Sequence, residues 1–235
     1  MNNNSRIFRH EIKFQITEAE KMILLSKIKD VMKLDKHAKN GTYLIRSLYF
    51  DDLVNSAYQD KMAGISARRK YRIRLYDHND SVIHLERKQK QDQYILKESA
   101  SLTRKETELI LSGTYDFLLQ REEAICKDFY IECMTNSLRP KVIVDYERIP
   151  YVFDEGDVRV TFDQQIRSGM LSFDLFDKNL PTLNVMESEN LIMELKFTEF
   201  LPQIIRNLIP TQHLHAVATS KYVLCFDKKY GTGSK

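Results

Sequence analysis

The stretch ARRKYRIRLYDHNDSVIHLERKQK, residues 67–90, decides the fold. Its first half alternates cationic and apolar side chains, with Arg72 and Arg74 on one side, which is the period of a half-buried strand. Its second half, residues 81–90, also has the pattern of a strand, and His-Asn-Asp at 78–80 is typical of a hairpin turn. The stretch therefore predicts two antiparallel strands with a strongly cationic polar side.

Similar strand patterns recur on both sides of this hairpin. They predict strands over residues 8–16, 44–50, 94–99, 141–148, 158–162 and 191–197, with one more near Met186. Helices are expected between them. Two capping boxes, Thr17 with Glu20 and Thr103 with Glu106, predict helices that run to about Lys33 and, with a break at Gly113, to about Ser137. Pro202 should begin a short helix, and residues 220–226 form a last strand or helix.

No internal repeat or Pro-rich linker divides the chain, so one domain over residues 1–230 is expected, with 231–235 as a loose tail. The pattern predicts an α+β fold, with about eight antiparallel strands and helices packed outside. Hydrophobic residues make up 43% of the chain, which is enough for a real core.

The overall charge does not suggest a nucleic-acid binder. There are 36 Lys and Arg residues against 33 Asp and Glu residues, a net charge of only +3. Cys126, Cys133 and Cys225 have no CxxC spacing, which indicates free thiols in a reducing compartment. The sequence shows no apolar signal core and no membrane span, so a cytoplasmic location is expected.

Charges of the same kind recur on one side of several strands. If these sides converge inside a closed barrel, eleven cations line it, namely Arg9, Lys13, Arg72, Arg74, Lys88, Lys90, Lys97, Arg148, Arg159, Lys196 and Lys221. Three acids oppose them: Glu11, Glu86 and Glu194. Confined cations repel one another and are costly to desolvate unless an anion fills the space. Arginine forks suit phosphate oxygens, so the pattern favours a phosphate-rich polyanion as the ligand.

The motifs resemble those of the vacuolar transporter chaperone (VTC) domain, the polyphosphate polymerase domain among the triphosphate tunnel metalloenzymes. The motifs that carry the resemblance are RHEIKF, SLYFD, ARRKYRIRLYD, HLERKQK, VDYERIPYV, VRVTFD, LIMELKF and SKY, in family order from about residue 6 to residue 226. The fold that this implies is an eight-stranded antiparallel β-barrel tunnel, in agreement with the strand pattern.

The resemblance also implies roles for individual residues. Those similar to the family's catalytic cations are Lys13, Arg72, Arg74, Lys88, Arg148, Arg159 and Lys221. Lys97, Lys196 and Ser220 resemble further substrate-binding residues, and strand parity adds Lys90. Glu194 resembles the metal-binding glutamate, with Mn²⁺ or Mg²⁺ as the expected cofactor.

The activity that the resemblance implies is transfer of the γ-phosphoryl group of ATP to a growing inorganic polyphosphate chain. ATP and polyphosphate are therefore the expected partners, without nucleic acid. Attachment to the cytosolic face of a membrane would need a separate membrane-protein partner.

Two other functions remain open. Related tunnel enzymes that hydrolyse triphosphates carry ExExK on the first strand, whereas here Arg9 stands in place of the first glutamate, which favours the polymerase. A non-catalytic module that binds polyphosphate or nucleotides is the third possibility.

Overall fold

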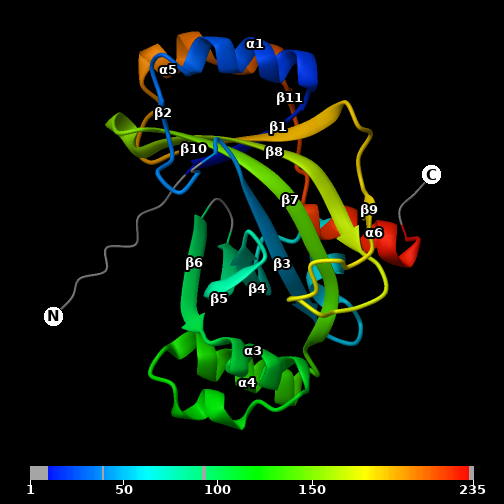
Figure 1. The fold of residues 1–235 in the computed structure, drawn as a ribbon. Helices are drawn as coiled ribbons and strands as arrows, with labels where there is room; N and C mark the ends of the chain where they lie inside the picture. The colour runs from blue at the N-terminus through cyan, green and yellow to red at the C-terminus, as the bar shows by residue number, and fades with distance from the viewer. Residues whose placement is uncertain (1–9, 39, 92–93, 233–235) are drawn as a thin grey trace, which may run out of the picture. The chain divides into compact units, whose positions relative to one another are not determined.

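The computed structural model describes residues 10–38, 40–91 and 94–232 (Figure 1). These residues form two compact units, and the chain crosses between them several times. The first unit contains the described residues up to Tyr43, Tyr146–Ile166 and Met186–Thr219, and the second contains Leu44–Asp145, Arg167–Val185 and the described residues from Ser220 onward. The strands belong to one 11-stranded antiparallel sheet, part of which lies in each unit, and each unit has its own hydrophobic core.

Two long strands belong to both units. They are β7 (Arg139–Phe153) and β8 (Val158–Gly169), which the short helix η2 (Glu155–Asp157) connects.

The sheet of the first unit is built around β1 (His10–Thr17) and β10 (Asn190–Phe197). Its strands follow the order β11-β1-β10-β8-β7, where β11 is His215–Ala216, and the short β2 (Lys33–Leu34) pairs with β7. The register places Lys13 of β1 opposite Glu194 of β10, which lies opposite Thr161 of β8. The polar residues of three strands therefore share one face.

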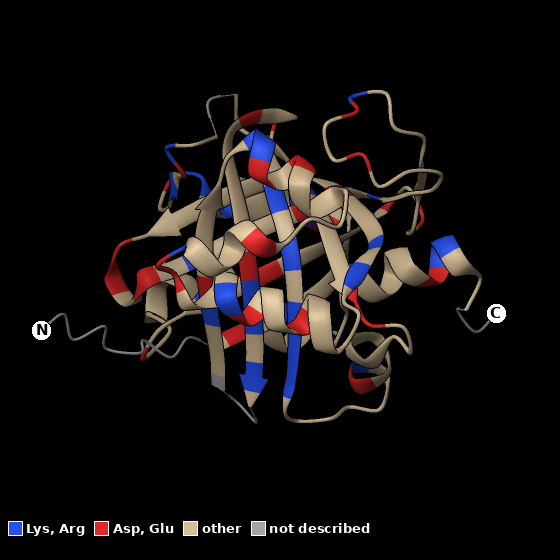
Figure 2. Cartoon of the chain, turned by 90° about the horizontal axis from the view of Figure 1, so that it is seen from below, with Lys and Arg blue, Asp and Glu red and all other residues tan. Residues whose placement is uncertain are grey.

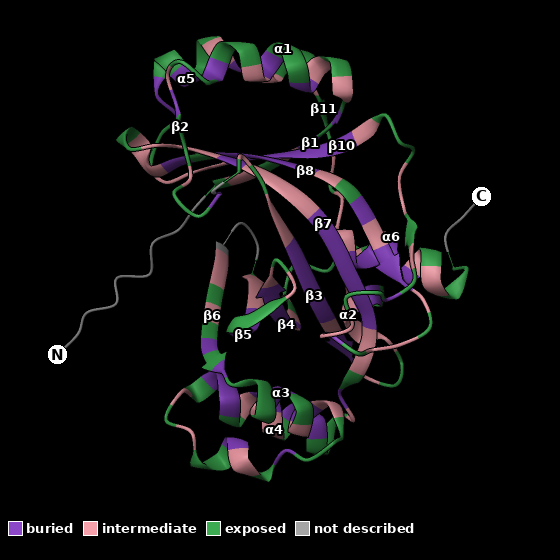
Figure 3. Cartoon of the chain, in the orientation of Figure 1, coloured by how far each residue is buried: buried purple, intermediate pink, exposed green. Residues whose placement is uncertain are grey.

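The other face of this sheet is apolar and is covered by α1 (Glu18–Ile28) and α5 (Gln203–Leu208), which lie side by side (Figures 1 and 3). Phe14, Leu24, Phe162, Met193 and Ile205 are buried in the resulting core. The helix η3 (Thr211–His213) precedes β11. Burial of these side chains fixes the strand faces, because a shift of one residue would expose them.

The sheet of the second unit contains the hairpin that the sequence predicted. Its strands follow the order β7-β3-β4-β5-β6, and the short β9 pairs with β8. Asp77 and His78 form the two-residue turn of the β4–β5 hairpin, both with positive φ. The bounds are β3 Tyr43–Asp51, β4 Arg68–Tyr76, β5 Asn79–Gln91, β6 Tyr94–Leu102 and β9 Thr182–Asn184.

Helices cover the apolar face of β4, β5 and β6. Tyr71, Ile73 and Leu85 pack there against Phe129 and Ile110 of the helical layer. Arg87 lies on the same face, and its guanidinium pairs with Glu98 and with Asp128 of α4, which ties this layer to the sheet. The helices of the second unit are α2 (Ser56–Met62), α3 (Arg104–Leu111), η1 (Asp116–Gln120), α4 (Ala124–Thr135) and α6 (Lys221–Tyr230).

Most of the predicted elements are confirmed. The described residues contain eight strands of eight or more residues, as expected, and both capping boxes are present. The first helix ends at Ile28 rather than at Lys33. Met32 enters the core from the turn that follows, so the apolar pattern in the sequence continues beyond the end of the helix. The strand expected near Met186 is β9, a few residues earlier. No described helix has both the length and the apolar character needed to cross a bilayer.

Candidate functional site

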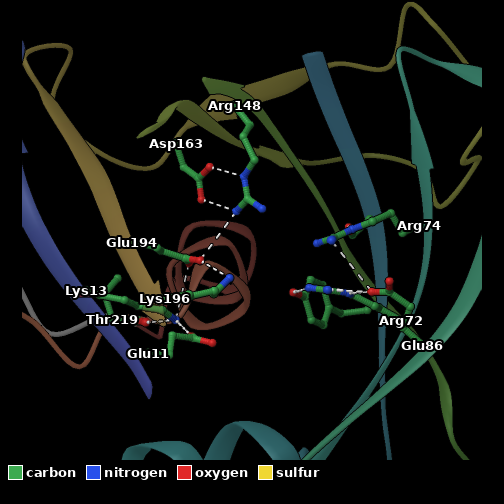
Figure 4. Close-up of polar contacts among 12 residues, drawn as sticks. Glu11, Lys13, Arg72, Arg74, Glu86, Arg148, Asp163, Glu194, Lys196 and Thr219 are labelled. Atoms are coloured by element: carbon green, nitrogen blue, oxygen red, sulfur yellow. Dashed lines mark hydrogen bonds and ion pairs between the residues drawn. The ribbon is translucent and has the colours of Figure 1, made fainter. Parts of the chain in front are cut away.

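Each sheet carries a charged network on the face opposite its core. In the first unit this is the Glu194 network, which consists of Glu11, Lys13, Arg148, Asp163, Glu194 and Lys196 (Figure 4). In the second unit it is the Glu86 network, which consists of Ser47, Tyr49, Arg72, Arg74, Glu86 and Lys97. Figure 2 shows Lys and Arg positions along the strands.

The Glu194 carboxylate is the centre of the first network and is only 5% exposed. The Nζ of Lys196 lies 2.8 Å from its Oε2, and the Nζ of Lys13 lies 3.7 Å from its Oε1. The Lys13 ammonium also lies 3.2 Å from Glu11 Oε1 and donates to the carbonyl of Thr219 at 3.3 Å. Two carboxylates therefore share one lysine, and strand register holds all of them on one face.

Arg148 joins the same network from β7. Its Nε and Nη2 donate to the two carboxylate oxygens of Asp163 at 2.6 and 2.7 Å, and Nη2 lies 3.7 Å from Glu194 Oε2. Burial alone would lower the pKa of Arg148, but Asp163 and Glu194 raise it well above its usual value. Asp163 thus fixes one edge of a permanently charged guanidinium. Among the described residues, none accepts a hydrogen bond from Nη1.

Arg159 and Thr161 lie on the same face of β8 without such partners. Arg159 is exposed and lies directly opposite Lys196, and the described residues include no ion-pair partner for it. The Thr161 hydroxyl is buried and has no hydrogen-bond partner in the part of the chain that the structure describes. Like charges directly opposite each other destabilise a sheet, and the contact of Lys196 with Glu194 offsets part of that cost.

Glu86 is the centre of the second network and is only 2% exposed. Arg72 donates to its Oε2 from Nε at 2.7 Å and from Nη2 at 2.6 Å, and Lys97 Nζ lies 2.6 Å from its Oε1. Arg74 Nη1 is farther away, at 3.9 Å from Oε2. A single carboxylate therefore organises three of the predicted phosphate-binding cations.

Neutral side chains of β3 fix the two arginines from the other side. Arg72 Nη1 donates to the Tyr49 hydroxyl at 2.8 Å, and Arg74 Nε donates to Ser47 Oγ at 3.1 Å. Burial alone would raise the pKa of Glu86, but the charges on Arg72, Arg74 and Lys97 lower it well below the ordinary value of 4.5. Burial lowers the pKa of Lys97, because it outweighs the attraction of Glu86. Glu86 is therefore ionised at neutral pH.

Replacing Glu86 by glutamine should lower the free energy of unfolding by about 3 kcal/mol at neutral pH, because three cations lose their shared counter-ion. Since the pKa of folded Glu86 lies below 4.5, its contribution is complete above that pH and is lost as the pH falls toward the folded pKa. The difference between wild type and variant should shrink by about 1.4 kcal/mol per pH unit below 4.5.

Urea unfolding of both proteins between about pH 3 and pH 7 measures this difference. The exposed Glu122, replaced by glutamine, is the matched control and should show no pH-dependent difference. A Glu86→Gln difference that stays constant with pH would contradict the ionised state assigned to Glu86.

The other predicted residues lie farther along β5 and at the start of α6. Lys88 lies opposite Lys97, and Lys90 lies one row farther along the same face, both half-buried. Ser220 is the N-cap residue of α6 and Lys221 is the first residue of that helix. The structure thus brings Lys13, Arg148, Glu194 and Lys196 into direct contact, and Arg72, Arg74 and Lys97 around Glu86. Arg9 lies outside the described residues.

The carboxylates fit a divalent ion that a substrate also binds. Among the described residues, no three His, Cys, Asp or Glu side chains are grouped closely enough to hold a metal by themselves. Mg²⁺ in nucleotide sites is usually held by one or two carboxylates together with substrate phosphates. Glu194 supplies one such carboxylate, and Glu11 contacts the same Lys13 ammonium and can supply the second.

The sequence reasoning did not select Lys70 and Asp163 for the site. Lys70 lies two residues before Arg72 on the same side of β4, and its Nζ donates to Ser220 Oγ at 3.2 Å. Asp163 lies four residues after Arg159 on the same side of β8. Strand parity alone could have identified both residues, because side chains at even spacing share a face.

Comparison with solved structures shows the fold. A candidate adenylyl cyclase from Hippeastrum, described as having a dominant triphosphatase activity, matches with a TM-score of 0.55 and 12% identity, covering 94% of this chain and 97% of that one. A candidate adenylate cyclase from Bacillus halodurans matches with a TM-score of 0.51 and 14% identity, covering 91% and 94%. A Pyrococcus horikoshii protein matches with a TM-score of 0.50 and 12% identity, covering 92% and 98%.

The likeness to these structures confirms the predicted antiparallel α+β tunnel-type fold, but in the described residues the sheet has eleven strands and is not closed into the predicted eight-stranded barrel, because β11 and β6 stand at its two ends. No curated protein matches the chain. The family model of the VTC domain matches residues 8–229, nearly the whole sequence. The chain therefore belongs to the VTC domain family.

Proposed function

We propose that this chain is a metal-dependent polyphosphate polymerase, which transfers the γ-phosphoryl group of ATP to the end of an inorganic polyphosphate chain. The observation that carries the proposal is the opposition of like charges in the sheet register. Arg159 lies opposite Lys196 in the first unit, and Lys88 lies opposite Lys97 in the second. Lys196 and Lys97 also contact the buried carboxylates of Glu194 and Glu86, and a phosphate chain would supply further negative charge to these rows of adjacent cations.

The residue types suit phosphoryl transfer. This reaction passes through a loose transition state, so positioning and charge stabilisation supply most of the rate. Arg159, Lys196 and Lys13 supply positive charge in the first unit, and Arg72 and Arg74 supply it in the second. The acceptor is itself a phosphate anion, so no general base is required.

Mn²⁺ or Mg²⁺ would be held by Glu194, with Glu11 as a second ligand. The ion would neutralise charge that develops on the transferring phosphoryl group. Lys13 and Lys196 orient the Glu194 carboxylate for this role. Arg148, fixed by Asp163, presents Nη1 on the same face.

Triphosphate hydrolysis is the second candidate. Glu11 and Glu194 both contact Lys13, and two carboxylates on one face are what a triphosphate-cleaving metal site uses. The Hippeastrum neighbour is described with this activity. A module that binds polyphosphate without catalysis is the third candidate.

We place the protein in the cytoplasm, where ATP is available and its three free cysteines stay reduced. The expectation of a separate membrane-protein partner remains a prediction.

The purified protein incubated with ATP and Mn²⁺ should release ADP and long-chain polyphosphate in step. Glu194→Gln should lower the rate by about 10²-fold or more, because the metal loses its principal ligand. Glu122→Gln, an exposed position outside both networks, should have no effect.

Orthophosphate without polymer would assign the protein to triphosphate hydrolysis. Tight polyphosphate binding without any turnover of ATP would assign the protein to the third candidate function, a non-catalytic binding module.

A further inference from the structure

Asp51 is a buried carboxylate at the end of β3, and it is only 2% exposed. Its Oδ1 accepts from the backbone N–H groups of Asp52 and Ala57 at 3.0 and 2.9 Å, and its Oδ2 accepts from the N–H of Tyr58 at 3.0 Å. The Tyr222 hydroxyl donates to the same Oδ2 at 2.6 Å. The carboxylate therefore joins three segments of the second unit, namely the end of β3, the first turn of α2 and the first turn of α6.

The hydrogen bond from Tyr222 to Asp51 is of the strong kind. Tyr222 is only 1% exposed, and a hydrogen bond to a carboxylate is shorter and stronger than one between neutral groups. Burial and the charge of Asp51 raise the pKa of Tyr222 above its usual value, so the hydroxyl keeps its proton and remains the donor. This hydrogen bond therefore fixes the first turn of α6, where the Ser220 side chain makes no capping hydrogen bond.

The start of α6 contains two of the predicted site residues. Ser220 is the N-cap residue and Lys221 is the first residue of the helix, so both directly precede Tyr222. The Ser220 hydroxyl also accepts from Lys70 Nζ at 3.2 Å, and that ammonium lies 4.9 Å from the centre of the Tyr222 ring. A shift of Tyr222 would therefore move Ser220 and Lys221 with the backbone.

The Tyr222 ring also reaches the Glu86 network. It stacks on the ring of Tyr49, with 5.1 Å between the two centroids. The Tyr49 hydroxyl accepts from Arg72 Nη1 at 2.8 Å, and Arg72 donates to Glu86 through its other nitrogens. All of these residues belong to the second unit. Tyr222 thus supports two groups of predicted phosphate contacts, Arg72 on β4 and the start of α6.

We propose that Tyr222, held by Asp51, is a positioning residue that fixes Arg72, Ser220 and Lys221 in the arrangement that binds the phosphates of the substrate. This inference rests on the proposed function and assigns a role in it to a buried pair outside the charged networks. Tyr222 takes no part in bond formation. It orders the phosphate-binding groups before the ligand arrives, so the ligand spends less of its binding free energy on ordering them.

A second tyrosine–aspartate hydrogen bond between α2 and α6 provides a matched control. The Tyr58 hydroxyl donates to Asp227 Oδ1 at 2.7 Å, and the Tyr58 ring stacks on Phe226 with 4.4 Å between the centroids. Asp227 lies in the second half of α6, beyond the turn that holds the site residues. Both hydrogen bonds join the same two helices, so the loss of either should lower stability, but only the loss of the Tyr222 hydroxyl should disturb the site.

Isothermal titration calorimetry with tripolyphosphate on the full chain tests the positioning role. Tyr222→Phe keeps the ring and removes the hydroxyl, and it should raise the Kd about tenfold, the scale of one displaced charge-assisted contact. Tyr58→Phe should lower the stability measured by urea unfolding but leave the Kd within about twofold of wild type. The stoichiometry of binding reports the folded fraction, so a variant that is only less stable loses sites and keeps the affinity of each site.

An equal rise in Kd for both variants would overturn the inference, because the hydrogen bond to Asp51 would then serve stability alone. An unchanged Kd for Tyr222→Phe would overturn it as well, and so would a wild-type protein that does not bind tripolyphosphate. Failure of the proposed function has a different result: the wild type forms no polymer from ATP, while Tyr222→Phe still weakens tripolyphosphate binding and Tyr58→Phe does not. That outcome supports the positioning role and rejects the polymerase.

Discussion

Replacing Arg159 by alanine is expected to lower the rate of polyphosphate synthesis by about 10²–10³-fold, the cost of removing one transition-state contact. The stability of the protein should not fall. Arg159 is exposed, faces Lys196 across the sheet and has no ion-pair partner among the described residues. Its removal relieves a like-charge pair, so the free energy of unfolding should stay within about 0.5 kcal/mol of wild type.

Steady-state kinetics with ATP, combined with urea unfolding, separates these two effects. Arg206→Ala is the matched control, because Arg206 is also an exposed arginine of the first unit and lies on α5, on the apolar side of the sheet. It should leave both activity and stability unchanged. Full activity of Arg159→Ala would show that the unpaired cation serves no substrate, and the argument from like-charge opposition would fail with it.

The strands could be predicted from the sequence because burial imposes a simple period on them. Residues such as Ile73 and Leu85 pack into the core. The charged residues that directly precede or follow them along each strand therefore lie on the other face. The capping boxes at Thr17 and Thr103 are local signals and were located correctly. The helix α2 gave no such signal. Its first turn is held by the Asp51 side chain, and Asn55 at its N-cap makes no capping hydrogen bond.

The contacts within the site could be predicted less well, because parity assigns a face but not a partner. Arg46 illustrates this limit. It is 1% exposed and pairs through two nitrogens with Asp145, 99 residues away, inside the second unit. Nothing in the local sequence separates this structural arginine from Arg74, one strand away. Partner identity depends on the order of strands in the sheet, which period-two patterns leave undetermined.

We expect Arg148 to combine a structural role with the phosphate-binding role that the proposed function gives it, and its variants should show both. Asp163 is fully buried and holds two nitrogens of the Arg148 guanidinium. Arg148→Met leaves that carboxylate buried without its partner, so the free energy of unfolding should fall by about 3–5 kcal/mol. Asp163→Leu should also lower the free energy of unfolding, because the Arg148 guanidinium then keeps only the more distant Glu194 carboxylate, 3.7 Å away.

The double variant Arg148→Met/Asp163→Leu distinguishes the two roles. Replacing both partners of a buried ion pair by apolar residues is often nearly neutral, so urea unfolding should show most of the lost stability restored. Polyphosphate synthesis should remain at least about 10²-fold below wild type, because the phosphate-binding Nη1 is still missing. A double variant that regains both stability and activity would make Arg148 a purely structural residue. One that regains neither would mean that the Glu194 network needs the ion pair to form, since Arg148 Nη2 also contacts Glu194.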